Sequence, residues 1–219
     1  MKVDFQRAFI APDDAQEVFL VRHGAVDAPE PDGLVDGRSD PPLNSRGRAE
    51  AAAVAARIGR ERVAALFTTP LRRTSETAVP ILEHHDLDPV VIPELGEVFL
   101  GEWEGHGIHD RGSRGEPEFL RVMREQRWDL IPGAEPGEAF ARRVGQGMES
   151  VADSVGSGTV AVAVTHAAVI AEMCRQVTGS DPFAFLTSAN GSLTRLVRMP
   201  KGRWLLLSFN ETEHLQLSG

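Results

Sequence analysis

Hydrophobic and polar positions alternate along the chain in blocks that predict strands followed by helices. Short apolar runs bounded by charged residues are typical of buried strands, and apolar residues every three or four positions are typical of amphipathic helices. The predicted strands are residues 18–21, 64–68, 90–92, 160–164, 193–197 and 204–209. The predicted helices are residues 45–58, 70–84, 117–128, 140–155, 167–178 and a short one from 181. This alternation predicts an α/β fold, a three-layer α/β/α sandwich around a mostly parallel mixed sheet.

Polar residues, prolines and glycines set the expected ends of these elements. Asn44 or Ser45 is expected to cap the first helix. Thr69 is expected to cap the second, with Pro70 as its first residue. Gly179 is positioned to end a later helix. The stretches expected to be loops are residues 25–43, 95–115 and 131–137. We expect residues 1–16 to form an arm and residues 17–219 to fold as a single domain.

Composition and charge limit the possible partners. The formal net charge is -9, so the surface repels nucleic acid and anionic membranes, and an anionic substrate needs a local pocket of positive charge. The chain shows neither the apolar stretch of a signal peptide nor a run long enough to span a bilayer. The single cysteine, Cys174, lies in an apolar stretch, which favours a buried thiol in a reducing compartment. We therefore expect a cytoplasmic protein with neither nucleic acid nor a membrane as a partner.

Residues suited to chemistry follow three of the predicted strands. In open α/β sheets, ligands bind beyond the carboxyl ends of the strands, so these residues are expected to converge. They are Arg22, His23 and Gly24 after the first strand, Arg72 and Arg73 in the first turn of the second helix, and Thr165 and His166 after the strongest strand.

Two histidines and up to three arginines at one sheet edge indicate a site for a phosphate ester. Arginine side chains match phosphate oxygens, helix N-termini add amide donors, and a neutral imidazole can attack phosphorus. Gly24 would let the backbone approach the ligand. A lone histidine at a strand end, or an arginine pair at a helix start, is more often structural. The three elements together favour a phosphate site.

The set and order of these motifs resemble the histidine phosphatase superfamily, also called the phosphoglycerate mutase-like superfamily, and within it the phosphatase-type members. The resemblance spans about residue 17 to the end of the chain. Its motifs are Arg22-His23-Gly24, residues 37–44 with Gly47, residues 69–78, Leu95-Gly96-Glu97 with residues 101–105, residues 132–135 with Arg143-Val144, Val164-Thr165-His166, and residues 204–215.

The resemblance implies a role for each matching residue. His23 would be the nucleophile that becomes phosphohistidine, and Glu97 would protonate the leaving alcohol and then activate water. The phosphoryl group would be held by Arg22, Arg73 and His166, with further contacts from Gly24, Thr165 and Ala167. The arginines and imidazoles would supply the positive field, so the resemblance implies no metal or other cofactor.

Some assignments stay open at this point. Arg72 is the alternative to Arg73. The glutamates that could replace Glu97 are Glu94, Glu102 and Glu104. Many family members carry an asparagine that contacts phosphate a few residues after the Arg-His-Gly triplet, whereas this chain lacks it and has Asp27 there. Ala167 follows the second histidine, where glycine is common.

An arginine-rich stretch over residues 106–128 matches no family pattern. One interpretation is a charged helical face paired with glutamates of the same stretch, Glu116, Glu118 and Glu125. The other is a lid-like insertion, at about 106–132, that covers the site and binds a second anionic or aromatic group. Substrate choice is expected to reside in this stretch. The histidine pairs His84-His85 and His106 with His109 are expected to lie on the surface without a metal.

Three functions compete. The first is a phosphatase that hydrolyses a small phosphorylated metabolite, and the second is a cofactor-dependent phosphoglycerate mutase. The resemblance implies that classic mutases have a longer segment between the acid/base loop and the later helix than this chain has, which favours hydrolysis. The third is a catalytically inactive binding or regulatory member, against which the complete set of Arg22, His23, Arg73 and His166 argues. A homodimer through an edge strand is a further expectation.

Overall fold

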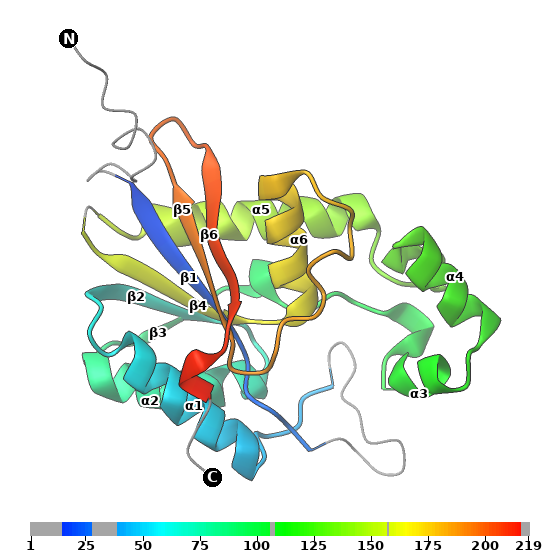
Figure 1. Ribbon diagram of the computed structural model, residues 1–219, viewed down its shortest axis with the longest axis horizontal. Helices are drawn as coiled ribbons and strands as arrows, with labels where there is room; N and C mark the ends of the chain where they lie inside the picture. The colour runs from blue at the N-terminus through cyan, green and yellow to red at the C-terminus, as the bar shows by residue number, and fades with distance from the viewer. Residues whose placement is uncertain (1–14, 28–38, 106–107, 157, 216–219) are drawn as a thin grey trace.

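A computed structural model describes residues 15–27, 39–105, 108–156 and 158–215 (Figure 1). Its strands are β1 (Gln16–Arg22), β2 (Val63–Thr68), β3 (Pro89–Val91), β4 (Val160–Thr165), β5 (Leu193–Arg198) and β6 (Trp204–Glu211). Its α-helices are α1 (Ser45–Ile58), α2 (Arg72–His85), α3 (Ile108–Ser113), α4 (Pro117–Glu125), α5 (Gly137–Asp153) and α6 (Ala167–Thr178). Its 3-10 helices are η2 (Pro93–Leu95), η3 (Gly101–Trp103), η4 (Trp128–Leu130) and η5 (Glu213–Leu215). The predicted arm over residues 1–16 lies almost entirely outside the described residues and stays a prediction.

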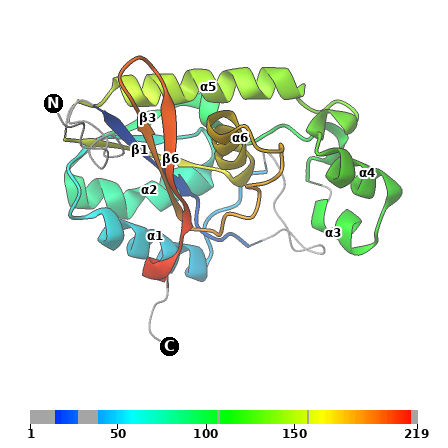
Figure 2. The ribbon, with the colours of Figure 1, turned by 45° about the horizontal axis from the view of Figure 1, so that its top comes forward.

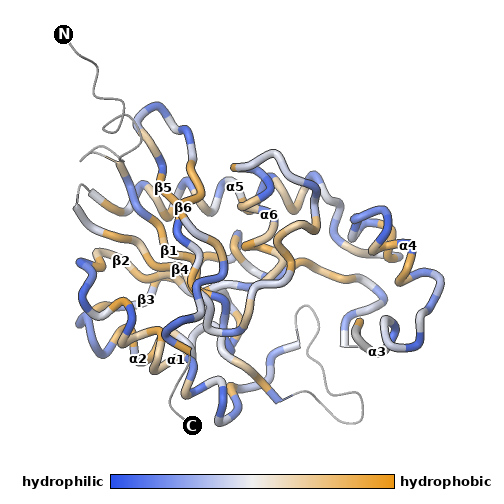
Figure 3. Tube along the Cα trace, viewed as in Figure 1, coloured by the Kyte–Doolittle hydropathy of each residue, from blue (hydrophilic) through white to orange (hydrophobic). Residues whose placement is uncertain are grey.

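The strands form one mixed sheet in the order β3-β2-β4-β1-β5-β6. The neighbours among β3, β2, β4 and β1 pair in parallel, whereas β5 is antiparallel to both β1 and β6. β4 is buried along its whole length, and apolar residues dominate the central strands (Figure 3). A continuous apolar run is what a parallel strand covered on both faces requires, so the mostly parallel mixed sheet predicted from the sequence is confirmed.

Helices cover both faces of the sheet, α1 and α2 on one side and α5 and α6 on the other (Figures 1 and 2). Successive residues of β1 point to opposite faces. Phe19 accordingly packs in the cluster that contains Ile58 of α1, and Leu20 packs in the cluster that contains Met148 of α5 and Ile170 of α6. α3 and α4 lie to one side of this sandwich (Figure 2).

Most element ends agree with the sequence, and the second helix is an exception. The Asn44 side chain accepts a hydrogen bond from the Gly47 N–H at 2.8 Å and so caps α1, and Gly179 ends α6 at φ 71. α2 begins at Arg72, not at Pro70. Thr69 precedes a proline, which favours extended backbone, and its hydroxyl serves other partners described below.

Three further expectations about secondary structure were wrong. The stretch over 95–115, expected to be a loop, contains α3, and Gly112 within this helix leaves room for the Phe119 ring, which would lie 2.9 Å from a Cβ there. α4 ends at Glu125, where Gln126 adopts φ 53, and does not reach Trp128. The helix expected from residue 181 is absent, and residues 182–187 form successive turns.

Two expectations about exposure can be compared with the structure. Cys174 is fully buried, and burial raises the pKa of its thiol to about 12, which confirms a core thiol. Among the described residues, no helix combines the length and apolarity needed to cross a bilayer.

Candidate active site

The two candidate histidines meet because β1 and β4 pair in parallel. Arg22 lies opposite Thr165 in the register, so His23 and His166 follow at the same level. The His23 N–H donates to the Thr165 carbonyl at 3.0 Å. The ring centroids of the two histidines are 5.3 Å apart. Both rings are buried, and the sheet therefore brings them together at its carboxyl edge, as the sequence predicts.

Hydrogen bonding sets which nitrogen of His23 is free. Nδ1 lies 2.9 Å from the Gly24 carbonyl oxygen, and because a carbonyl can only accept, Nδ1 must carry the proton. In the neutral ring, Nε2 then holds the lone pair. Burial, together with Arg73 and Arg22, holds the pKa of His23 well below its usual value of 6.5. The free ring is therefore a neutral imidazole with a nucleophilic Nε2.

His166 is held by a threonine that the sequence analysis treated only as a helix cap. Its Nε2 lies 3.0 Å from the Thr69 hydroxyl, which in turn lies 3.0 Å from the Thr74 hydroxyl. Its buried Nδ1 has no hydrogen-bond partner among the described residues. Burial and the neighbouring Arg73 lower the pKa of His166 well below 6.5, so this ring too is neutral. An unsatisfied nitrogen in the interior is costly and indicates a site that a ligand completes.

The structure distinguishes the two arginines of α2. Arg73 is 2% exposed and close enough to both histidines to lower their pKa values. One of its N–H groups donates to the Ser39 carbonyl. Arg72 is exposed, and its Nε–H donates to Glu76 on the outer face of the helix. Only Arg73 therefore lies at the site.

Arg22 is anchored by a loop that no sequence signal indicated. Its Nη1–H donates to the Ser188 carbonyl, while its buried Nε and the buried Ser188 hydroxyl have no partner among the described residues. The side chain of Asn190, in the same loop, donates to the His23 carbonyl at 2.9 Å. Both connections span more than 160 residues, which is why local patterns do not indicate them.

Of the candidate acids in this loop, Glu97 lines a cavity beside Arg22, and both Glu97 and Glu104 are close enough to Arg73 to act on the pKa of its guanidinium. Glu97 is partly buried. Burial raises the pKa of its carboxyl above 4.5, although the nearby Arg73 and Arg22 act in the opposite direction. Glu94 and Glu102 are exposed, which removes two of the alternatives. The third alternative, Glu104, is not among the described residues that line this cavity.

Arg143 holds the Glu97 loop in place from α5. Its guanidinium donates to the Gly96 carbonyl at 2.6 Å and to the Glu97 carbonyl at 3.0 Å. It also forms a two-pronged ion pair with Glu135, at 2.7 and 2.8 Å. Residues 132–135 and Arg143 were predicted only as a family motif. In the structure, the ion pair between Glu135 and Arg143 helps to fix the backbone that carries Glu97.

The comparisons with known proteins agree with this geometry. The sequence pattern of the histidine phosphatase superfamily (branch 1) matches residues 18–212. The chain belongs to the histidine phosphatase superfamily.

Among its superfamily relatives, the metal-independent phosphoserine phosphatase of Arabidopsis thaliana is 27% identical over 99% of this chain and 93% of its own length. The mycobacterial glucosyl-3-phosphoglycerate phosphatase structure is 25% identical and covers 90% of this chain and 99% of its own, with a TM-score of 0.75. A phosphoglycerate mutase structure from Bacillus anthracis has a TM-score of 0.77 at 18% identity, covering 92% of this chain and 96% of its own, and shows a shared fold alone. The phosphatase relatives support a phosphomonoesterase of the histidine phosphatase type.

One of the expected substrate contacts needs correction. The Thr165 hydroxyl donates to the Leu95 carbonyl at 2.7 Å, so its proton is not available for a phosphoryl oxygen. Gly24 stays a predicted substrate contact, and the close approach that the structure describes is to Gly47, whose carbonyl oxygen would lie 2.5 Å from a Cβ at Gly24. Ala167 begins α6 and lines the cavity beside Arg22, where a helix N-terminus offers free amide N–H groups. Asp27 is exposed.

The arginines of the stretch over 106–128 pair with acids of the same region. Arg111 contacts Glu116 at 2.7 Å, Arg121 contacts Glu125 at 3.0 Å, and Arg127 contacts Asp129 at 2.8 Å. This agrees with the expected charged face, with Asp129 as an acid that the sequence analysis did not name. His106 and the side chain of His109 lie outside the described part of the chain. Among the described residues, no group of three or more possible ligands is placed to bind a metal.

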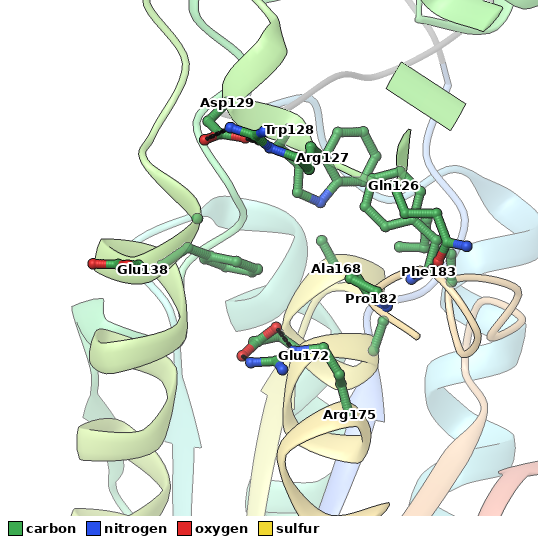
Figure 4. A pocket seen from close by; sticks show the side chains of 14 residues that line it. Gln126, Arg127, Trp128, Asp129, Glu138, Ala168, Glu172, Arg175, Pro182 and Phe183 are labelled. Atoms are coloured by element: carbon green, nitrogen blue, oxygen red, sulfur yellow. Dashed lines mark hydrogen bonds and ion pairs between the residues drawn. The ribbon is translucent and has the colours of Figure 1, made fainter. Parts of the chain in front are cut away.

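Two cavities meet at Trp128. The first, of about 460 Å³, contains Arg22 and Glu97 and extends under α3 and α4. The second, of about 340 Å³, lies between α5, α6 and the turns over 182–187 (Figure 4). Charged residues of the second cavity pair with one another, Arg127 with Asp129 and Arg175 with Glu172. Only the first cavity contains candidate catalytic residues.

Proposed function

We propose that this protein is a phosphatase that hydrolyses a small phosphate monoester through a phosphohistidine intermediate on His23. The observation that carries the proposal is the pairing of two buried, neutral histidines, with ring centroids 5.3 Å apart, beside the guanidinium groups of Arg22 and Arg73. Guanidinium groups match the oxygens of a phosphoryl dianion and attract its charge. The names of the phosphatase relatives support the same reaction class.

In the first step, the Nε2 lone pair of His23 attacks phosphorus, and the bond between phosphorus and the alcohol oxygen breaks. Glu97 gives its proton to that oxygen, and the raised pKa of its carboxyl keeps the acid form populated. Arg22, Arg73 and the Nδ1–H tautomer of His166 stabilise the charge on the phosphoryl oxygens. In that tautomer Nε2 accepts a hydrogen bond from the Thr69 hydroxyl.

In the second step, water attacks the phosphohistidine and the phosphorus–nitrogen bond breaks. The Glu97 carboxylate takes a proton from the water, and inorganic phosphate leaves. Each step uses side chains of this chain, and the arginines supply the positive charge that a metal ion supplies in other phosphoryl-transfer enzymes. In this proposal the lid-like insertion at about 106–132, whose described part contains α3 and α4, belongs to the single domain over 17–219.

The test is to trap the intermediate. Rapid acid-free quenching after mixing with a ³²P-labelled aryl phosphate is expected to leave label on the wild-type protein and none on His23→Ala. His84→Ala, on the exposed end of α2, is the matched control and is expected to retain both label and turnover. Full turnover by His23→Ala would contradict the covalent route, and a protein that neither turns over nor retains label would be an inactive member.

The mutase alternative makes a separable prediction. A mutase would convert 3-phosphoglycerate to 2-phosphoglycerate and would depend on 2,3-bisphosphoglycerate, whereas a phosphatase releases phosphate without it. Release of inorganic phosphate from the same labelled protein is the result we expect. A cytoplasmic location and a homodimer through an edge strand remain predictions, and the buried Cys174 thiol supports the first because it suits a reducing compartment.

A further inference from the structure

The cavity next to the catalytic residues is apolar beyond its catalytic end. Apart from Arg22, Glu97, Thr187 and Ser188, every described residue that lines it is apolar. The apolar residues are Val98, Leu100, Ile108, Phe119, Met123, Trp128, Ala167, Ala168 and Leu186. Its volume of about 460 Å³ lies within the range of sites that hold a small molecule, roughly 300–1,000 Å³. Glu97, which would protonate the leaving alcohol, lines this cavity, so the alcohol part of the substrate is expected to lie here.

The charges along this cavity do not suit a second ionised group on the substrate. Arg22 is the only cation among the described lining residues, and the phosphoryl group requires it. Arginines of the lid lie outside the lining and pair with acids, as Arg111 does with Glu116 and Arg127 with Asp129. A carboxylate in this cavity would meet no second cation, and an ammonium no acid besides Glu97, among the described lining residues, so burying either group is costly.

The apolar walls are held in place by packing. The Phe119 ring of α4 lies against Gly112 of α3, where even a Cβ would approach it to 2.9 Å. Trp128 stacks on Phe183 with ring centroids 4.4 Å apart (Figure 4). Because rings fixed on two sides lose little further freedom when a ligand binds, contact with an apolar group is favourable.

We propose that this cavity is an apolar subsite, and that the preferred substrates are phosphate monoesters of an apolar alcohol, alkyl or aryl, without a second charged group. The inference rests on the proposed phosphatase function and adds the substrate class. It differs from what the name of the Arabidopsis relative would suggest, because phosphoserine carries both a carboxylate and an ammonium group.

A homologous series of n-alkyl phosphates, from ethyl to hexyl, tests this directly. Their leaving groups have nearly the same basicity, so differences in kcat/KM report contact with the cavity. Each methylene buried in an apolar site is expected to raise kcat/KM roughly fourfold until the cavity is full. O-phosphoserine and 3-phosphoglycerate are expected to fall below butyl phosphate. A flat alkyl series, or phosphoserine above hexyl phosphate, would overturn the inference while phosphate release still supports the proposed function.

Two substitutions on α4 separate the subsite from general effects on folding. Met123 is 40% exposed and lines the cavity, whereas Leu120 is 52% exposed on the same helix and does not. Met123→Gln is expected to lower kcat/KM for hexyl phosphate by roughly tenfold, the lower end for a change in an apolar pocket, and to leave ethyl phosphate nearly unchanged. Leu120→Gln is expected to change neither. An equal loss of kcat/KM for hexyl and ethyl phosphate in Met123→Gln, or the same losses in Leu120→Gln, would overturn the subsite. If the wild-type protein hydrolyses no ester at all, the subsite and the proposed function are overturned together.

Discussion

Gly24 offers the sharpest test of how the fold supports the nucleophile. An added Cβ would lie 2.5 Å from the Gly47 carbonyl oxygen and 3.0 Å from two other Gly47 backbone atoms. Ordinary contact begins at 3.4 Å, so the two backbones must separate by about 0.9 Å. Both partners are backbone, and neither can move aside as the end of a flexible side chain would.

The cost of Gly24→Ala follows from overpacking and from the position of the ring. Forcing extra atoms into a packed interior destabilises the native state by ~1–3 kcal/mol, which for a chain of this length lowers Tm by roughly 2–12 °C. The Gly24 carbonyl is also the acceptor that orients the His23 ring. Because a misplacement of about 1 Å costs on the order of 10²-fold in rate, kcat/KM is expected to fall by that factor.

Thermal melting by circular dichroism and p-nitrophenyl phosphate kinetics measure the two effects separately. Gly137→Ala is the matched control, because Gly137 begins α5 and no atom lies within 4 Å of its added Cβ. That control is expected to keep its activity and to melt at the same temperature or slightly higher, since alanine restricts the unfolded chain. If Gly24→Ala melts and turns over like the wild type, the tight approach to Gly47 is unimportant and the reasoning is refuted.

Three further predictions concern the arginines and the acid. Arg73→Ala is expected to lower kcat on the order of 10²–10³-fold, whereas Arg72→Ala on the exposed face of α2 changes kcat little. Equal losses of kcat in steady-state assays of the two variants would contradict the placement of Arg73, and not Arg72, at the site. Because burial raises the pKa of Glu97, its acid form persists above pH 4.5, and kcat/KM for alkyl esters is expected to fall as pH rises through that pKa. Glu97→Gln should abolish this fall in the pH–rate profile. A fall that persists in the variant would belong to another group. Arg143→Lys cannot reproduce the fork that holds Glu135 and three backbone carbonyls, so denaturant unfolding should show a loss of about 1–3 kcal/mol, together with a lower kcat. A loss of stability without any change in kcat would separate this arginine from catalysis.

The elements that the sequence predicted best are those whose burial is uniform. The apolar run of β4 is buried from Val160 to Thr165, and α6 begins and ends as predicted, because hydrophobic period and a C-terminal glycine act locally. α3 was missed because the glycines in and around it indicate a loop when read alone. Gly112 lies inside this helix, and the Phe119 ring of the next helix packs against it.

The candidate site shows the same division. His23 and His166 were predictable because each directly follows a strand, and parallel strands end at the same edge of a sheet. The roles of Thr69 and Ser188 were not, because their partners lie about 100 residues or more away along the chain. The sequence also predicted that the Thr165 hydroxyl contacts the ligand. In the structure this hydroxyl donates its hydrogen bond to the Leu95 carbonyl, 70 residues away along the chain.

The register between β1 and β4 has a consequence for how new specificities can arise. The two imidazoles are set by the ladder in the middle of the sheet, where a slip of one residue would turn every side chain to the opposite face. Part of the wall around the alcohol comes from residues 108–130, through Ile108, Phe119, Met123 and Trp128, and the ladder does not constrain these residues. Exchanging that segment between relatives should therefore change which alcohol is preferred, while the reaction at the two histidines stays the same.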